Sequence, residues 1–414
     1  MGIIKNAIRY LLYRSFIASM LYGIVYHRWL SRYNKKEGFL SGSSLKNYLS
    51  EDKIFQYHGK ETVKFYEPFH STNYQLPNQI SFYINQEFEV SAGEVYHFEQ
   101  AFLMGENAVG LTLEGQIILD TAMDLPNVLH KCSPRLLMNY DSKKTSYELE
   151  WCLSAVHIFC NAHYVNYFHW VCDSLLLIEG LRAFEKKTNQ KIKLIVNDHL
   201  TSFQTDLLTY LDFKAEDLIT WKEEDKVLVK NLLVVKSRRT GTNMDEIVSP
   251  QGVRWLRESL VRSLKNRKPL YGKRIFLSRQ ETTCRRIVNF DQIEPILKRY
   301  EFEIVNPDKL SIADQVNLFT NMEILCAPHG AGLTNIIFSE HLKILEFIGN
   351  VDVPDDFQWY CAYYSMSQAI GHQYSFLIGE TIPLLKAGKT KQIYDLKMNV
   401  KQVDQILEAI INEA

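Results

Sequence analysis

The stretch Glu323-Ile-Leu-Cys-Ala-Pro-His-Gly-Ala-Gly-Leu-Thr-Asn335 joins an apolar run to a turn with two glycines. The run from Glu323 to Cys326 predicts a buried strand, and a helix is expected from Gly332 to Ser339. Gly330 and Gly332 allow the backbone to turn sharply and a ligand to approach it closely. Because the first turn of a helix presents free N–H groups and the positive end of its dipole, this turn is a candidate site for a diphosphate.

The side chains of this turn narrow the type of phosphate site. His329 and Thr334 add donors beside the backbone N–H groups. A dinucleotide fingerprint would place a third glycine where Asn335 stands, and the absence of Gly-Lys-Ser/Thr excludes a P-loop. The alternative is a tight turn that needs glycines for its geometry alone. The adjoining histidine favours the phosphate site.

Helices and strands alternate on both sides of this stretch. Helices are expected at residues 167–184, 202–211, 253–264, 290–300 and 312–320, and strands at 193–196, 232–235, 274–277, 302–305 and 343–347. Short apolar strands separated by helices indicate a parallel sheet that is covered on both faces. A looser segment, Lys236 to Pro250, divides two such series. We therefore predict an α/β protein of two Rossmann-like lobes with parallel sheets facing across a cleft.

The lobe boundaries follow from the same patterns. Residues 41–240 form the first lobe, which has a β-rich start, and residues 250–390 form the second. The final segment, 391–414, contains an amphipathic helix from about Val400 to Ile411. We expect this helix to pack back onto the first lobe.

The N-terminal segment, residues 1–40, is basic and has no acidic residue before Glu37. Its uncharged run, Ser15 to His27, is shorter than the roughly 20 apolar residues that cross a bilayer. We expect an amphipathic helix that lies on an anionic membrane surface through residues 1–36. The alternative is a helix packed on the body of the protein itself.

The composition favours a cytoplasmic protein without a nucleic-acid partner. The 414 residues include 47 basic and 48 acidic side chains, so the net charge does not indicate DNA or RNA binding. The seven cysteines, an odd number without a Cys-x-x-Cys pair, are expected to be reduced. No Asn-x-Ser/Thr sequon occurs. With the basic N-terminus, these features predict a peripheral location on the inner face of the cytoplasmic membrane.

Three arginines follow the strand that ends at Leu277, namely Arg279, Arg285 and Arg286. Ligands of parallel-sheet proteins bind at the carboxyl ends of the strands. Guanidinium groups suit phosphate there because they stay charged and bind in a bidentate manner. The alternative is a solvated surface loop. The glycine turn in the same lobe favours a phosphate contact.

A helix is expected to begin at the segment Asn166-Tyr-Phe-His-Trp-Val-Cys-Asp173. His169 and Asp173 are four residues apart and therefore share a helix face. One of them is a candidate general base for a hydroxyl group, and the other would orient it. Phe168 and Trp170 are candidate walls of a pocket. The alternative, which the spacing alone favours, is a buried histidine with satisfied hydrogen bonds.

The histidines and cysteine before this helix are a weaker candidate for a zinc site. His157, Cys160 and His163 are close in sequence, but His-x-x-Cys-x-x-His is not a usual ligand spacing. A strand there would place Cys160 on the opposite face from both histidines. We therefore expect no metal site.

In this order, these blocks resemble glycosyltransferase family 61. The matching residues are Asn166 to Asp173, Ser278-Arg279, Arg286-Ile-Val-Asn289, Gln315-Val-Asn-Leu-Phe319, Ala327 to Asn335 and Ile344-Leu-Glu346. The resemblance covers about residues 95–380. One departure is the segment Asn289-Phe-Asp291, because the family usually has Glu directly after the asparagine.

The resemblance implies a GT-B fold, inversion at the anomeric carbon and no required cofactor or metal, with the nucleotide-sugar as co-substrate. The first lobe would be the acceptor side and the second would bind the nucleotide-sugar. His169 and Asp173 would be catalytic, and either is a candidate for the base. The donor would contact Arg279, Arg286, Asn289, Gln315, His329, Gly330, Ala331, Gly332, Leu333, Asn335 and Glu346.

The implied function is that of an inverting glycosyltransferase in bacterial capsule, O-antigen or exopolysaccharide synthesis, with a glycan or lipid-linked acceptor. The main alternative is a non-catalytic carbohydrate-binding or scaffold protein that keeps the fold. Such a protein would be expected to lose His169, Asp173 or Arg286, and all three are present. Another nucleotide-dependent enzyme, such as an epimerase, would need the dinucleotide fingerprint that the chain lacks.

Overall fold

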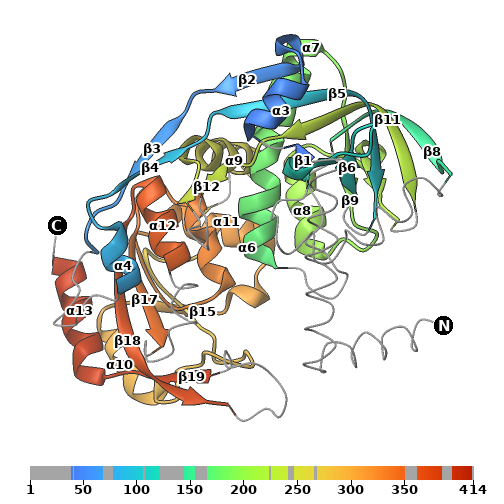
Figure 1. Cartoon of the computed structure of the whole chain (residues 1–414). Coiled ribbons are helices and arrows are strands. Elements are labelled where there is room, and N and C mark those ends of the chain that lie inside the picture. Colours follow the sequence, from blue (N-terminus) through green and yellow to red (C-terminus); the bar gives the residue numbers. More distant parts are fainter. Residues whose placement is uncertain are drawn as a thin grey trace, which may run out of the picture.

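The computed structural model describes residues 39–40, 42–68, 78–105, 108–121, 144–153, 166–222, 225–240, 247–264, 268–349, 361–384 and 394–412. Within them the chain forms a mixed α/β protein with two main sheets (Figure 1). The predicted α/β class is confirmed. The basic segment before Phe39 and the three residues of the zinc alternative lie outside the described residues.

The first sheet has nine strands among the described residues, in the order β1-β7-β6-β5-β11-β8-β9-β10, with β2 paired to β5. They are β1 (Phe39–Leu40), β2 (Ile54–His58), β5 (Gly93–Met104), β6 (Val109–Leu111), β7 (Ile117–Ile118), β8 (Tyr147–Leu153), β9 (Lys193–Val196), β10 (Leu218–Thr220) and β11 (Lys226–Val235). Strands β11, β8, β9 and β10 are parallel, whereas β5 is antiparallel to β11 and β6. The predicted parallel sheet therefore holds for one side only, because short turns join β5, β6 and β7.

The helix that carries the predicted His169–Asp173 motif runs without a break through four parts. These are α6 (Tyr167–His169), the π-helical turn η3 (Trp170–Ser174), the 3₁₀ turn η4 (Leu175–Leu177) and α7 (Ile178–Thr188). The side chain of Asn166 caps its beginning by accepting a hydrogen bond from the backbone N–H of Phe168, at 2.9 Å. A π-helical turn inside a helix is frequent at functional sites.

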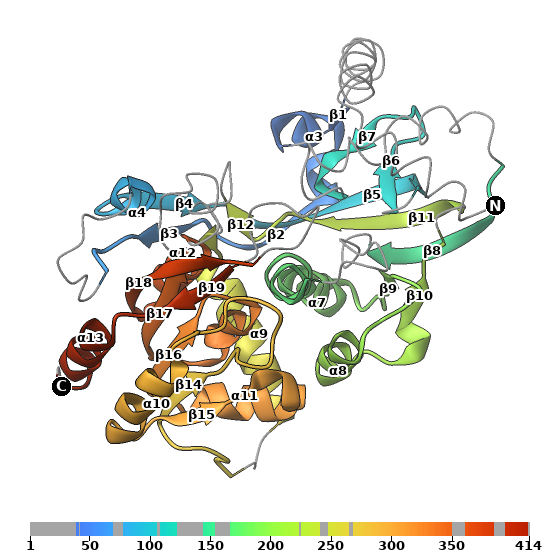
Figure 2. The same cartoon turned by 90° about the horizontal axis from the view of Figure 1, so that it is seen from below.

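The other helical elements of the first unit are short. They are α3 (Gly42–Tyr48), η1 (Glu51–Lys53), η2 (Leu119–Thr121), α8 (Ser202–Tyr210) and η5 (Ala215–Asp217). Helices α7 and α8 contact α9 and α11 of the second unit, and Figure 2 shows them on the side of the first sheet that faces this unit. The two units are therefore packed against each other through helices.

The second sheet has six strands in the described residues, in the order β15-β14-β16-β17-β18-β19. They are β14 (Arg274–Leu277), β15 (Glu303–Val305), β16 (Ile324–Pro328), β17 (Lys343–Gly349), β18 (Gln373–Pro383) and β19 (Tyr394–Lys397). All neighbours are parallel except β18 and β19. The sequence predicted strands at 274–277, 302–305, 323–326 and 343–347, and the structure adds β18 and β19.

Helices cover both faces of the second sheet, as its apolar strands require. They are α9 (Pro250–Ser263), α10 (Phe290–Arg299), η6 (Pro307–Lys309), α11 (Ile312–Asn321), η7 (Ala331–Phe338), α12 (Cys361–Ile370) and α13 (Val400–Asn412). The helix predicted after the glycine turn is present as η7, but it is a 3₁₀ helix. Helix α12 was not predicted.

Two small hairpins lie where the units meet. They are formed by β3 (Glu61–Lys64) with β4 (Glu87–Val90), and by β12 (Arg239–Thr240) with β13 (Ile247–Val248). Helix α4 (Asn78–Tyr83) precedes β4, and Figure 1 shows the β3–β4 hairpin reaching from the first unit to α12 of the second, where the two are in contact. Residues assigned by sequence to the first lobe therefore also pack on the second unit.

A buried charge cluster fixes this junction. The Arg238 side chain is 0% exposed and donates hydrogen bonds to the carbonyl of Ser91, the Glu61 carboxylate and the Ser249 hydroxyl, each at 2.7 Å. A buried guanidinium is costly unless its donors are paired. These contacts therefore hold the beginning of β12 in one position.

The C-terminal helix does not pack where we expected. Helix α13 contacts α10 of the second unit, and Asp404 accepts hydrogen bonds from Arg299 and Tyr300 at the end of that helix. Lys343, at the beginning of β17, donates to the carbonyl of Ile410 at 3.0 Å. The apolar face of α13 therefore completes the core of the second unit and not that of the first.

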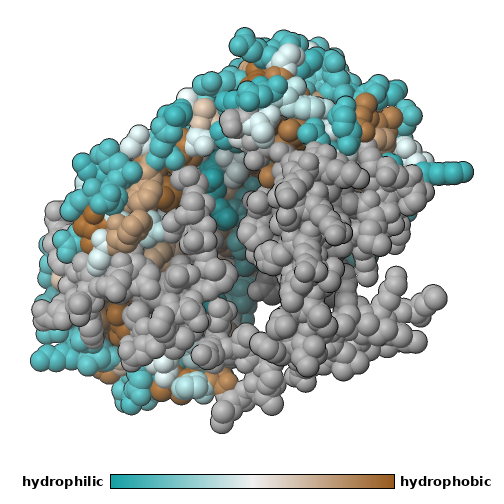
Figure 3. Space-filling model, in the orientation of Figure 1, coloured by the Kyte–Doolittle hydropathy of each residue, from teal (hydrophilic) through white to brown (hydrophobic). Residues whose placement is uncertain are grey.

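The outer surface gives two further observations. On the face shown in Figure 3, hydrophilic residues predominate among those that the structure describes, and the hydrophobic ones form separate groups. None of the described helices has both the length and the apolar character needed to cross a membrane.

Candidate active site

The glycine turn follows β16 at the carboxyl end of the second sheet. The backbone N–H of His329 donates to the carbonyl of Phe347 on β17 at 2.9 Å, and η7 begins at Ala331. Nδ1 of His329 lies 2.5 Å from Oε1 of Glu346. Because a carboxylate accepts hydrogen bonds, Nδ1 carries the proton in this pair.

Glu346 is fully buried on β17 and is held on both oxygens. Its Oε1 faces His329, and its Oε2 accepts a hydrogen bond from the hydroxyl of Tyr374 on β18 at 2.6 Å. Burial and the charge of Glu346 raise the pKa of Tyr374 well above its usual value, so this hydroxyl remains a donor. The carboxylate therefore connects the turn to two neighbouring strands.

Burial lowers the pKa of His329, although Glu346 acts in the opposite direction. The positive charges of Arg285 and Arg279 lower it further. At neutral pH the ring is therefore neutral and oriented by Glu346.

Arg279 and Arg285 bring two guanidinium groups to the turn. A Cβ atom on Gly330 would lie 2.3 Å from Nη1 of Arg279, so the glycine makes room for this side chain. Nη1 of Arg285 lies 3.5 Å from the carbonyl oxygen of His329. Burial, and secondly the charge of Arg285, lower the pKa of Arg279. Two like charges are thus held close together beside the predicted phosphate site.

Both of these arginines have unused donors. Among the described residues, the buried Nε atoms of Arg279 and Arg285 have no hydrogen-bond partner, and neither side chain forms an ion pair with a carboxylate. A buried N–H donor without an acceptor is costly. The arrangement therefore suits an anionic ligand.

Arg285 and Arg286 are neighbours with different surroundings. Arg285 has a left-handed backbone with φ 58°, and its N–H donates to the carbonyl of Tyr394 on β19 at 2.6 Å. Such a conformation costs a non-glycine residue about 1–2 kcal/mol. Arg286 instead pairs with the buried Asp395, with Nη2 at 2.6 Å and Nε at 3.0 Å from Oδ2. Of the two, the structure therefore places Arg285 beside the turn, whereas Arg286 was the predicted donor contact.

The other predicted donor contacts are spread around the turn. Asn335 is buried, and its amide donates to Oε1 of Gln315 at 2.7 Å. Gln315 in turn donates to the carbonyls of Pro307 and Leu310. Asn289 lies apart from them, because both ends of its amide are bonded to the backbone of Met398. These three side chains hold segments of the second unit together.

The residues at the beginning of η7 differ in exposure. Ala331 is exposed, and Gly332 is half-buried. A Cβ atom on Gly332 would lie 3.6 Å from the nearest atom, which is an ordinary contact. Leu333 is buried in the hydrophobic core. Of the two glycines in the turn, only Gly330 is required by close packing.

His169 and Asp173 form the pair that the sequence predicts. Nδ1 of His169 lies 2.7 Å from Oδ2 of Asp173. The Asp173 side chain is 2% exposed and the His169 side chain is 23% exposed. Nη1 of Arg239, on β12, lies 2.7 Å from the other oxygen of Asp173. Arg239 was not predicted, because it lies 66 residues further along the chain in a segment without a recognisable motif.

The structure brings this helix and the glycine turn together. The hydroxyl of Tyr167 on α6 donates to Oδ1 of Asn335 on η7 at 2.5 Å. The ring of Tyr363 on α12 lies 6.0 Å from that of Phe168 and 5.3 Å from that of His329, between ring centroids. Phe168 and Trp170, the predicted pocket walls, are both buried in the core. The predicted base and the predicted phosphate site therefore belong to one region.

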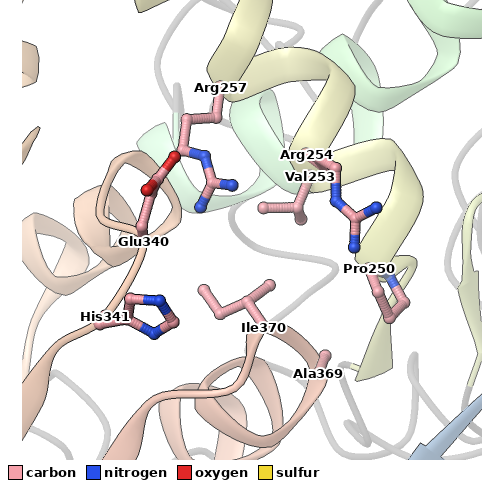
Figure 4. Close-up of a pocket in the computed structure, with 8 residues that line it drawn as sticks. All are labelled: Pro250, Val253, Arg254, Arg257, Glu340, His341, Ala369 and Ile370. Atoms are coloured by element: carbon pink, nitrogen blue, oxygen red, sulfur yellow. The ribbon is translucent and has the colours of Figure 1, made fainter.

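A separate pocket of about 400 Å³ lies between α9, the segment before β17 and the end of α12 (Figure 4). Arg254 and Arg257 extend into it from α9, and His341 and Ile370 face them. Since His341 precedes β17, this pocket lies at the amino end of the parallel strands. It shares no lining residue with the glycine turn.

The chain matches a protein-family model. Residues 167–343 match the family model described as Glycosyltransferase 61, and this range contains His169, Asp173 and the glycine turn. No curated protein matches the chain. Residues 167–343 therefore form a glycosyltransferase family 61 domain, and this identifies the chain as a glycosyltransferase.

Proposed function

We propose that this glycosyltransferase moves a sugar from a nucleotide-sugar to a hydroxyl group of a glycan or lipid-linked acceptor, with inversion at the anomeric carbon. The two packed units would correspond to the acceptor and donor lobes of a GT-B enzyme. Support comes from the carboxyl end of the second sheet, where ligands of parallel-sheet proteins bind. Helix α6, which carries His169, comes from the first unit and contacts η7 at this end.

The observation that carries the proposal is the pair of arginines at the glycine turn. Arg279 and Arg285 have buried Nε donors that no described residue accepts. A nucleoside diphosphate would supply acceptors for these donors and negative charge to offset two neighbouring cations. When the sugar leaves, negative charge grows on the diphosphate, and fixed positive groups stabilise it most at that moment. This scheme requires no resident cofactor.

His169 is the proposed base. Its Nδ1 donates to Asp173, so Nε2 is the nitrogen that accepts a proton. The acceptor oxygen forms a bond to the anomeric carbon while the bond between that carbon and the diphosphate breaks. The electron pair of the broken bond leaves with the diphosphate. The hydroxyl proton moves to Nε2, and Asp173 stabilises the imidazolium that results.

Glu346 has a different role in this proposal from the ribose contact that the resemblance implies. Both of its oxygens accept hydrogen bonds inside the protein, from His329 and Tyr374. We assign it the task of holding the His329 ring beside the diphosphate. The ribose contact then falls to other groups.

The cellular setting is also a proposal. A basic segment without acidic residues before Glu37 suits an anionic membrane surface. We propose that the enzyme works at the inner face of the cytoplasmic membrane in bacterial capsule, O-antigen or exopolysaccharide synthesis. A lipid-linked acceptor would be reached from that surface.

Nucleotide binding gives the direct test. A panel of nucleoside diphosphates is added to the full chain, and the melting temperature is measured. We expect at least one of them to raise it, and we expect Arg285→Gln to lose this rise. Arg254→Gln, which removes an exposed arginine of α9, is the matched control and should keep it. A panel without effect on the wild-type chain would contradict the proposal.

A positive panel selects the nucleotide, and mass spectrometry of reactions with the corresponding sugar donors then tests transfer. A product that carries the sugar on an acceptor hydroxyl supports the proposed function. Nucleotide binding without transfer to any acceptor would favour the scaffold alternative.

A further inference from the structure

The carboxylate of Asp173 is contacted on both oxygens, from two parts of the chain. His169, on the same helix, faces Oδ2, and Arg239, on β12, faces Oδ1, each at 2.7 Å. The carboxylate is almost completely buried. A buried carboxylate needs partners for its charge, and these two side chains provide them.

Arg239 is held in place by its neighbours in the chain. Arg238, directly before it, is buried and bonded to Ser91, Glu61 and Ser249. Arg239 itself pairs with Val248 in the β12–β13 hairpin, and the N–H of Ser249 donates to the carbonyl of Arg238. The guanidinium of Arg239 therefore extends toward Asp173 from a fixed strand.

Arg238 and Arg239 are neighbours in the chain but contact different parts of the protein. Arg238 has no exposed surface and joins β3, β12 and the beginning of α9. The Arg239 side chain is 26% exposed and faces the helix that carries His169. Removal of Arg238 would disturb the junction as a whole, whereas removal of Arg239 would act on the Asp173 carboxylate.

We propose that Arg239 is a positioning residue for sugar transfer, acting through Asp173 on His169. By binding Oδ1, it keeps Oδ2 directed at Nδ1 of the imidazole. Without it, the carboxylate is free to rotate and the ring loses its fixed tautomer. The inference rests on the proposed function, in which His169 removes the proton of the acceptor hydroxyl.

A positioning role makes a specific kinetic prediction. Arg239→Gln should lower kcat about ten- to a hundredfold, the range expected when a reacting group is misplaced by about 1 Å. The KM for the nucleotide-sugar and the rise in melting temperature with nucleotide should not change, because Arg239 acts on Asp173 and the arginines assigned to the diphosphate are Arg279 and Arg285. Arg254→Gln serves as the matched control and should keep the wild-type kcat.

A double-mutant cycle separates this role from a merely structural one. If Arg239 acts through Asp173, then Arg239→Gln should lower kcat further by less than about twofold when Asp173→Asn is already present. Equal factors in both backgrounds would overturn the inference. Arg239→Lys keeps the charge and should retain more activity than Arg239→Gln, and it replaces that variant in the cycle if the glutamine variant does not fold.

The result for His169→Ala tells the two proposals apart. An inactive His169→Ala together with a fully active Arg239→Gln overturns this inference alone. A fully active His169→Ala overturns the proposed function, and the positioning role falls with it. An inactive His169→Ala with a non-additive effect of Arg239→Gln supports both.

Discussion

The candidate active site contains two histidine–carboxylate pairs, His169–Asp173 and His329–Glu346, that differ in how the chain builds them. His169 and Asp173 lie on one helix, four residues apart. His329 directly follows β16, and Glu346 lies within the neighbouring parallel strand β17. The same two chemical groups are therefore brought together once by helical periodicity and once by the register of a sheet.

The surroundings of the two pairs differ more than their chemistry. The His169 side chain is 23% exposed, and that of His329 is 10% exposed. The second oxygen of Asp173 forms an ion pair with Arg239, and the second oxygen of Glu346 accepts a hydrogen bond from Tyr374. A partly exposed ring is suited to exchange a proton with a substrate, whereas a buried ring with a lowered pKa is suited to a fixed, neutral role. Four predictions test this contrast.

The largest effect is expected at His169. His169→Ala should lower sugar transfer about 10²- to 10⁴-fold, the usual contribution of a general base. Its nucleotide-induced rise in melting temperature should persist, because the glycine turn is intact. His329→Ala should lose that rise as well. Activity assays measure sugar transfer, and thermal melts measure the nucleotide-induced rise. If His169→Ala and His329→Ala behaved identically in both, the two histidines would not have different roles.

The second effect concerns stability. Glu346→Gln leaves an amide between two buried donors, His329 and Tyr374, and the unpaired groups should lower the free energy of unfolding by about 1–3 kcal/mol. Tyr374→Phe leaves one oxygen of the buried Glu346 carboxylate without its donor and should also cost about 1–3 kcal/mol. Denaturant titrations measure both values. A Glu346→Gln variant as stable as the wild type would contradict the shared role of Glu346.

The third effect concerns the turn beside the second pair. Gly330→Ala should weaken nucleotide binding about tenfold, equivalent to about 1.4 kcal/mol, because the new methyl group displaces the Arg279 guanidinium. Gly332→Ala is the matched control and should bind normally, since its Cβ atom meets only ordinary contacts. Titration calorimetry measures the two dissociation constants. Equal values would show that the position of Arg279 does not matter for binding.

The smallest effect is a pH dependence of stability. Burial lowers the pKa of His329, and it lowers that of His372 from 6.5 to about 4. Because both rings stay neutral in the folded protein, their contribution to the free energy of unfolding is complete above pH 6.5. This contribution is lost as the pH falls below 6.5, and for His372 the loss continues until about pH 4. For His372 the loss between pH 7.5 and 5.5 should be about 1 kcal/mol.

Denaturant titrations at these two pH values measure this loss. His372→Gln should reduce the difference, and His329→Gln should reduce it in the same direction. An unchanged difference in His329→Gln would show that its ring does not stay neutral in the folded protein, and would weaken the contrast with His169.

Much of the fold was predictable from local pattern. The strands at 193–196 and 274–277 were predicted with the observed bounds, because short apolar runs between polar residues allow few alternatives. The His169–Asp173 contact follows from helical spacing alone. The strand and turn around Gly330 were also apparent, since glycine and a following helix mark such turns.

Other features depend on residues far apart in the sequence. Arg285 and Arg286 are alike in sequence, and their different positions depend on the pairing of their loop with β19 more than a hundred residues later. The antiparallel side of the first sheet and the packing of α13 on α10 likewise arise from long-range contacts. Local periodicity contains no information on these pairings.

The sequence by itself determined most of the helices and strands, the glycine turn, and the pairing of His169 with Asp173 on one helix. Only the tertiary structure decided that Arg285 faces the turn, that Glu346 is enclosed by His329 and Tyr374, and that Arg239 completes Asp173. The physical reason is that a helix or strand forms from neighbouring residues. The charge around a buried carboxylate is set instead by whichever distant side chains the packed core brings to it.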